Sequence, residues 1–545
     1  MGEDEGRQAL LALGRELVDW ACRNDPPLAT DLGVHTYDDR FADLSLDGLA
    51  NRAAEARAYL DRLNGTDPGV LDAESRVEWK LIWSWLKDSI RETSELRLWE
   101  RNPCLWVESV LLGCYFLVSR DFAPLEQRAA NLASRMEAVP AFLGQARVTL
   151  RAPVRPAVEL AVDEAGAGRG FFAHLAAATS PQVPHLKARL QGAAEKAERA
   201  LADFAEFLRR DLLPCSRPEF AIGREAVDRI LRERFFLNLG IAEVVRIGSE
   251  AFDRIRGELE ELAGQIAPGK GWMKILEEMK LEQPPEDGVL EAYRREVEQS
   301  RAFVEESRVI PLPGDEQLVV ERTPVFERSL VPFAAYLTLP PLDPRPQPGI
   351  FWVTCPEPGD PPNRVAELLA NHNRFSCRLT ALHEGYPGHH LQSVHASRAG
   401  TRFRRLFSCS LFQEGWALYC EELMHRLGYL SEPRMKVQML RDQLWRSARV
   451  IIDGRLQLGQ MSIEEGARLL AEGVGMGPAE ALAEVKRYAL EPTQPLSYFI
   501  GRLEILRLRD RFGHKAGRLD LFEFHRQLLS RGSIPMALIE EELFA

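Results

Sequence analysis

Two short segments contain the residues whose types and spacing could do chemistry. The first runs from His383 to His390 and reads HEGYPGHH, and the second carries Glu414 within FQEGWA. Imidazole and carboxylate groups are the usual ligands of catalytic zinc, where three protein ligands leave the fourth position open for water. The pattern therefore predicts a zinc site built from His383, a second histidine and Glu414.

The spacing of the histidines requires an interruption in the helix that carries them. In an unbroken helix the second ligand would lie at i+4, but i+4 from His383 is Pro387. A histidine at i+7 would lie about 10 Å further along the axis, too far for zinc bonds of about 2.1 Å. Because Pro387 lacks a backbone N–H and Gly388 tolerates unusual dihedrals, we expect the helix to break here. The break would bring His389 back to the metal, with His390 as the alternative ligand.

Neighbouring residues could complete a hydrolytic site. Glu384 directly follows the first histidine and could take a proton from a zinc-activated water and pass it to the leaving group. Tyr498 lies at the end of a predicted loop, residues 494–498, where its phenol could donate to an oxyanion. Glu421, two helical turns beyond Glu414, either competes as a ligand or accepts a hydrogen bond from a ligand histidine.

Structural roles compete with these functional ones. A single histidine is usually a packed or surface residue, but eight of the eleven histidines lie between 372 and 525 and four lie within 383–395. Guanidinium groups bind carboxylates in bidentate fashion, so Arg449, Arg455 and Arg502 are candidates for holding a substrate carboxylate. For each arginine an ion pair or a surface position is the commoner role.

Composition limits the partners and the compartment. The net charge of −12 argues against nucleic acid as the main partner. There is no stretch of about 18 apolar residues, so no membrane span is expected. The eight cysteines form no C-x-x-C pair, and the first residues are polar rather than an apolar signal-peptide core. These features favour the cytoplasm.

Apolar residues recur at helical spacing through most of the chain, so the sequence predicts a mainly α fold. Ser45 is an expected N-cap, Asp72 or Ser75 opens a long helix, and Ser462 begins a capping box. Short β-like runs occur at 318–320, 333–339 and 350–354, just before the histidine motif. We expect one domain over residues 1–545, mostly helical over 1–305, with the strands and the metal site in 306–545.

The sequence also resembles a bacterial family known as domain of unknown function 885. The resemblance rests on HEGYPGHHLQ (383–392), EGWALYCEEL (414–423), SYFIGRLEILRLR (497–509) and LATDLGVHTYDD (28–39). It implies a helical fold similar to that of zinc peptidases of the angiotensin-converting enzyme, thimet oligopeptidase and carboxypeptidase Taq type, with two lobes around a deep channel. It also implies that His389 and Glu414 are ligands and that Tyr498 matches the catalytic tyrosine of those enzymes.

The function expected from the residues and the resemblance is zinc-dependent hydrolysis of short peptides or related amides, with Glu384 as general base. Two alternatives stay open. One is a biosynthetic amide or ester hydrolase that acts on a small metabolite, and the other is a non-catalytic metal-binding or ligand-binding protein.

Overall fold

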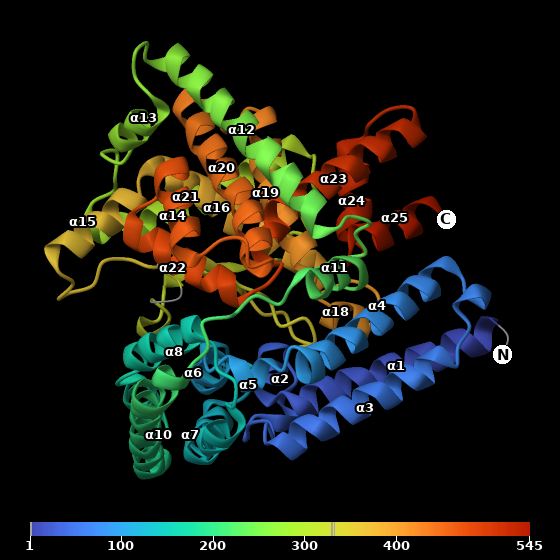
Figure 1. The fold of residues 1–545 in the computed structure, drawn as a ribbon, viewed down its shortest axis with the longest axis vertical. Coiled ribbons are helices and arrows are strands. Elements are labelled where there is room, and N and C mark those ends of the chain that lie inside the picture. The colour runs from blue at the N-terminus through green and yellow to red at the C-terminus, as the bar shows by residue number, and fades with distance from the viewer. Residues whose placement is uncertain (1–2, 329–330, 332) are drawn as a thin grey trace.

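Helices dominate the structure, a computed structural model that describes residues 3–328, 331 and 333–545 (Figure 1). One small sheet interrupts them, so the prediction of a mainly α fold with a small sheet is confirmed. The predicted arrangement of two lobes around a deep channel stays a prediction, as does the assignment of the whole chain to one domain.

Between residues 3 and 307 the regular elements are helices, apart from one isolated β-bridge between Val154 and Arg217. The helices before the sheet are α1 (Glu3–Asn24), α2 (Pro26–Asp31), α3 (Leu46–Asn64), α4 (Ala73–Ile90), α5 (Leu98–Arg101), α6 (Cys104–Ser119), α7 (Leu125–Thr149), α8 (Arg155–Ala167), α9 (Phe171–Thr179), α10 (Lys187–Phe207), α11 (Arg224–Glu233), α12 (Ile241–Ile266), α13 (Trp272–Met279) and α14 (Val289–Ser307). Short 3-10 or π turns connect several of them, for example the π turn Leu208–Leu212 that extends α10.

Residues after 317 form the sheet and a second set of helices. The strands are β1 (Leu318–Arg322), β2 (Ala334–Leu337) and β3 (Gly349–Val353). The helices that follow are α15 (Pro362–Asn371), α16 (Arg374–Glu384), α17 (His389–Ala396), α18 (Arg402–Leu406), α19 (Ser410–Arg426), α20 (Pro433–Gln457), α21 (Ile463–Val474), α22 (Pro478–Leu490), α23 (Gln494–Ala516), α24 (Leu521–Leu529) and α25 (Met536–Phe544).

Polar caps start the helices where the sequence predicted them. The Ser45 side chain accepts the backbone N–H of Gly48, and Ser462 and Glu465 form the predicted capping box. Asp72, rather than Ser75, caps α4, because its carboxylate accepts the N–H of Ser75. Each cap satisfies an N–H that the first helical turn leaves unpaired.

Buried apolar side chains form two clusters. The smaller cluster belongs mainly to α6–α10, the teal helices in the lower left of Figure 1. The larger one joins α1 and α4 to the helices and strands of the second half. In the same view, α12 lies along α20, and α20 in turn packs on α23. The candidate site is built on elements of the larger cluster.

Two glycines let α19 and α23 cross at close range. A Cβ at Gly415 would lie 2.4 Å from the backbone carbon of Gly501, and a Cβ at Gly501 would lie 1.9 Å from the carbonyl oxygen of Leu411. No side-chain rotation could relieve such overlaps, because the atoms met are backbone atoms. This crossing brings Glu414, next to Gly415, close to the first turn of α23.

The sheet is mixed and short. Its strand order is β1-β3-β2, with β1 parallel and β2 antiparallel to the central strand β3. All five residues of β3 are buried, as its continuous apolar sequence GIFWV predicts. The β-like runs of the sequence are therefore confirmed as strands, although at least one bound of each strand differs from its run by one or two residues.

No single helix among the described residues is long and apolar enough to cross a bilayer. One pair bent by 91°, Ala73–Arg101 with Cys104–Ser119, meets the length and composition test for a membrane span.

The predicted loop at residues 494–498 is wrong, because α23 already begins at Gln494. Pro495 lies in the first turn, where the missing N–H of proline costs nothing.

Candidate metal centre

The helix that carries the histidine motif breaks where the sequence predicted. Helix α16 ends at Glu384 and α17 begins at His389, and the Tyr386–Pro387 peptide bond between them is cis. Gly388 sits so close to the preceding helix that a Cβ there would lie 1.8 Å from the carbonyl oxygen of His383. Only glycine fits this position, so the turn folds tightly back on the end of α16.

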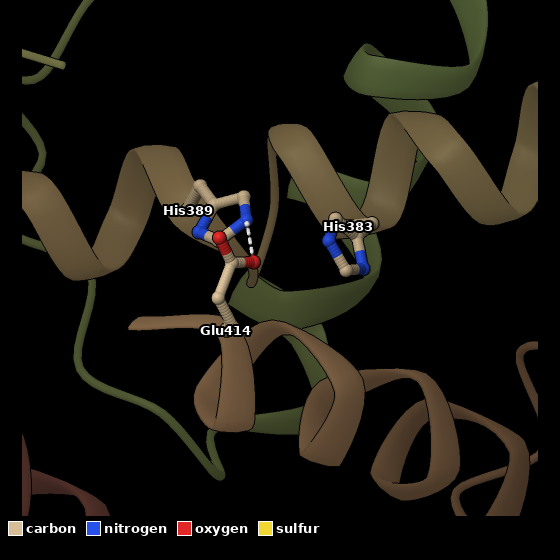
Figure 2. Close-up of side chains that lie close together, drawn as sticks. All are labelled: His383, His389 and Glu414. Atoms are coloured by element: carbon tan, nitrogen blue, oxygen red, sulfur yellow. Dashed lines mark ion pairs between the residues drawn. The ribbon is translucent and has the colours of Figure 1, made fainter. Parts of the chain in front are cut away.

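The break brings the two histidines and Glu414 together. Ligand atoms of His383, His389 and Glu414 all lie within 4.8 Å of one another, and this is the single group of its kind among the described residues (Figure 2). The rings of the two histidines are 4.8 Å apart between centroids. Nε2 of His389 lies 3.3 Å from Oε2 of Glu414. Helices α16, α17 and α19 thus each supply one side chain.

His390 points elsewhere. Its Nδ1 lies 3.2 Å from the hydroxyl of Tyr336 on β2, and a Cβ at Gly349 on β3 would lie 2.5 Å from the same nitrogen. The ring is fully buried against the sheet, and burial lowers its pKa to about 3. The geometry therefore favours His389 over His390 as the second ligand, and His390 packs α17 on the sheet.

Glu421 holds His383 rather than joining the cluster. Its Oε1 lies 2.7 Å from Nδ1 of His383, and both side chains are buried. When Nδ1 carries the proton and donates it to this carboxylate, Nε2 becomes the ring nitrogen that can bind a metal. The sequence left two roles open for Glu421, and the geometry matches the hydrogen-bond acceptor.

The three side chains fit a zinc ion. Two imidazoles and one carboxylate form a donor set of catalytic zinc sites, and ligands at about 2.1 Å in a tetrahedron lie about 3.4 Å apart. The 3.3 Å between Nε2 of His389 and Oε2 of Glu414 matches that value. The ligand atoms of the whole group lie within 4.8 Å of one another, so they would move slightly closer together around one ion. Oε2 of Glu414 is buried and has no well-aligned hydrogen-bond donor among the described residues, although Nε2 of His389 lies 3.3 Å from it.

Burial and charge act together on the pKa values of this group. Burial, helped by the positive charge of His389, lowers the pKa of His383 well below its ordinary value. Burial also opposes charge on His389 and Glu414, but their mutual attraction outweighs it, so the pKa of His389 is raised and that of Glu414 is lowered. Glu414 is thus a carboxylate, and a cation could replace the proton on His389.

Glu384 has the protonation behaviour of a general base. Burial raises its pKa to about 7, partly offset by the positive charge of His389. The backbone N–H of Tyr336 on β2 also donates to its carboxylate. A pKa near the working pH suits proton transfer in both directions. The sheet thus contributes directly to the site through the backbone of its β2 edge.

Tyr498, the fifth residue of α23, lies beside Glu414. Contact with its hydroxyl helps to lower the pKa of Glu414, and burial raises the pKa of Tyr498 itself. Nε2 of Gln494, four residues earlier, lies 3.4 Å from Oε1 of Glu414. The structure therefore places the predicted tyrosine at the cluster, and it adds Gln494, which the sequence argument missed.

The three predicted substrate arginines have three different surroundings. Arg449 is buried near the cluster, since its positive charge lowers the pKa of Glu414. Nε and Nη2 of Arg502 both bind Glu422, which neutralises its charge. Arg455 is exposed near the end of α20, six residues beyond Arg449. A substrate role for these two arginines stays a prediction.

Arg446 was missed by the sequence argument. It lies one helical turn before Arg449 on α20, and its positive charge lowers the pKa of both His383 and Glu384. No local motif marks this residue, and the one available signal was its i, i+3 spacing from Arg449 on a largely buried helix.

The fold and these side chains define a mainly helical protein with a candidate His-His-Glu metal centre. The chain belongs to the family described as "Bacterial protein of unknown function (DUF885)", whose model matches residues 26–543. The family assignment made from the motifs is therefore confirmed, while the likeness to zinc peptidases stays a prediction. No curated protein matches the chain.

Two solved structures share the fold over almost the whole length. One is described as a "putative lipoprotein of unknown function from Shewanella oneidensis", with 22% identity, a TM-score of 0.79, and coverage of 98% of this chain and 99% of that one. The other is a "putative lipoprotein from Colwellia psychrerythraea", with 18% identity, a TM-score of 0.83, and coverage of 99% and 98%. At such identities the likeness shows the fold alone.

Proposed function

We propose that this protein is a zinc-dependent hydrolase of short peptides or related amides. The observation that carries the proposal is the convergence of His383, His389 and Glu414 from three helices, with Glu384 directly beside the first ligand. Three protein ligands leave a fourth position for water or substrate, which distinguishes a catalytic zinc site from a structural one.

The chain's own residues then have separate tasks. Zinc, when bound, supplies a Lewis acid that polarises a carbonyl and acidifies water. Glu384, with its pKa of about 7, accepts the proton of the attacking water and returns it to the leaving amine. The Tyr498 phenol, beside Glu414, donates to the carbonyl oxygen as negative charge develops on it. Glu421 fixes the ring of His383 through its Nδ1.

The substitution Glu384→Gln tests this assignment. It keeps the size and most contacts of the side chain but removes the base, so zinc content stays at wild-type level while turnover falls by about 10²–10⁴-fold. Zinc is measured by elemental analysis, and turnover on a panel of short peptides, amides and esters. The matched control is Glu260→Gln on the exposed face of α12, which changes neither value. Full activity in Glu384→Gln would remove Glu384 from the mechanism.

The location and partners of this protein are a separate proposal. We propose a cytoplasmic protein that acts on small molecules and binds neither nucleic acid nor membranes, and its net charge of −12 supports the exclusion of nucleic acid. Cell fractionation checks the location, because the two solved relatives are described as lipoproteins. Recovery of this protein in the membrane fraction would contradict the proposal.

A further inference from the structure

Two arginines beside the metal centre, Arg449, which is buried, and Arg446, which is largely buried, have more hydrogen-bond donors than acceptors. Among the described residues, Nε and Nη1 of Arg446 and Nη1 of Arg449 are buried and have no hydrogen-bond partner. The side chains of Arg446 and Arg449 are only 12% and 5% exposed. A buried charged donor without an acceptor is costly, so three of them on neighbouring side chains call for an explanation.

Aromatic rings hold these guanidinium groups without using their N–H edges. The central carbons of Arg446 and Arg449 lie 4.6 Å and 4.4 Å from the centroid of the Trp445 ring. The Arg449 carbon also lies 4.5 Å from the ring of Tyr498, and the Arg446 carbon lies 5.9 Å from it. Stacking on a ring face fixes the plane of a guanidinium and leaves its edge free to bind an anion.

Arg449 is also anchored by polar contacts, which makes it the rigid member of the pair. Its Nε donates to the hydroxyl of Tyr488 at 2.8 Å, and its Nη2 donates to Glu484 at 3.1 Å. Glu484 in turn binds Arg487 at 3.1 Å. These contacts leave Nη1 as the single donor of Arg449 that has no acceptor among the described residues.

Among the described residues, no carboxylate is hydrogen-bonded to Arg446. Asp442 is its nearest acidic neighbour at 3.7 Å, beyond hydrogen-bond range, and Asp442 already accepts Nη1 of Arg441 at 2.9 Å. Asp442 therefore lies within ion-pair range of two arginines but is hydrogen-bonded to Arg441 and not to Arg446. The Arg446 guanidinium lies against the ring of Tyr498, next to the centre.

We infer that Arg446, together with Nη1 of Arg449, forms a carboxylate-binding subsite beside the metal centre. The inference rests on the proposed function and deepens it, because it assigns the substrate class: peptides or amides that carry a free carboxylate close to the bond that is cut. A carboxylate has two oxygens in one plane and matches the donors of two guanidinium edges. The same chemistry is offered by a terminal carboxylate and by an acidic side chain.

Binding of matched probes to the full-length, zinc-loaded Glu384→Gln protein tests the subsite without turnover. The probes are one fluorescently labelled tripeptide with a free carboxyl terminus, the same tripeptide ending in carboxamide, and an amidated tripeptide with glutamate as its last residue. We expect the carboxamide form to bind about tenfold to a hundredfold more weakly than a probe whose carboxylate reaches the subsite. Adding Arg446→Gln removes that difference, and Arg446→Lys, which keeps the charge, restores part of it.

Arg468→Gln is the matched control, because Arg468 is an exposed arginine on α21 to which no role at the site is assigned. It leaves the preference unchanged. Preference for the glutamate probe over the free terminus supports the subsite and assigns it to an acidic side chain. A preference for the carboxylate probes that survives in Arg446→Gln, or equal binding of all three probes by the Glu384→Gln protein itself, overturns the inference, and hydrolysis by the wild type would then leave the proposed function intact. If the wild type neither binds nor cleaves any of the probes, both the inference and the proposed function are contradicted.

Discussion

The close crossing of α19 and α23 makes a prediction that needs no knowledge of the substrate. In Gly501→Ala, the new Cβ would lie 1.9 Å from the carbonyl oxygen of Leu411, about 1.5 Å short of the 3.4 Å at which ordinary contact begins. Because that oxygen belongs to the backbone of α19, the two helices must move apart. Glu414 on α19 and Tyr498 on α23 lie on the two sides of this crossing, so the movement disturbs the metal centre.

The expected loss in the free energy of unfolding can be estimated from packing. Overfilling a packed interior typically costs about 1–3 kcal/mol, and the better helix propensity of alanine returns up to about 1 kcal/mol. Since the overlap is with backbone, we expect the upper part of the range, a net loss of about 2 kcal/mol in the free energy of unfolding. With an unfolding entropy of about 2.1 cal/mol/K per residue, this lowers the Tm of the chain by about 2 °C. Zinc affinity falls as well.

Gly257→Ala on α12 is the control. Gly257 is exposed in the middle of its helix, and a Cβ there meets nothing within 4 Å. The same substitution should therefore stabilise the protein by about 0.5–1 kcal/mol. Thermal melts and competition with a chromogenic zinc chelator measure both variants. Wild-type stability and zinc affinity in Gly501→Ala would refute the argument that this crossing positions the site.

Three further predictions concern the ligands and the charges around them. His389→Gln should lose bound zinc, whereas His390→Gln, whose ring faces Tyr336, should keep it, and equal zinc loss in elemental analysis of both would contradict this choice of ligand. Glu421→Gln should weaken zinc binding by about 10–100-fold, measured against a chelator, because the substitution loosens the ring of His383, and an unchanged affinity would deny Glu421 that role. Burial opposes charge on Glu484, but the attraction of Arg487 and Arg449 outweighs burial and lowers the pKa of Glu484 to about 2 from an ordinary 4.5. The ionised carboxylate therefore contributes about 3 kcal/mol to the free energy of unfolding above pH 4.5, and this contribution is lost as the pH falls toward 2. Glu484→Gln should therefore flatten the acid limb of the unfolding free energy between these pH values, and an unaltered limb would show that the pair contributes nothing.

Local sequence signals predicted the helices and their caps well. Ser45, Asp72 and Ser462 cap helices because their side-chain oxygens lie within reach of N–H groups three residues away, which is a purely local relation. The break near Pro387 is local for the same reason. The first turn of α23 was misread as a loop, because a proline at the start of a helix has the same sequence appearance as a proline in a turn.

Contacts between residues far apart in the sequence decided the remaining site assignments. The sequence presented His389 and His390 as adjacent candidates, and only the packing of His390 against Tyr336 on β2 separated them. Likewise, Arg502 and Arg446 looked alike as arginines on helices. Arg502 is neutralised by Glu422, which lies 80 positions away, while Arg446 is left with unpaired donors.

The sequence alone determined the kind of chemistry available and the place where a helix had to break, because ligand types and backbone preferences are properties of neighbouring residues. Tertiary structure decided which side chains meet. Glu414 reaches the two histidines, and Glu421 reaches His383, because α19 packs beside α16 and α17. That packing depends on contacts between segments far apart in the chain, such as the glycine crossing with α23, and no local pattern encodes their relative positions.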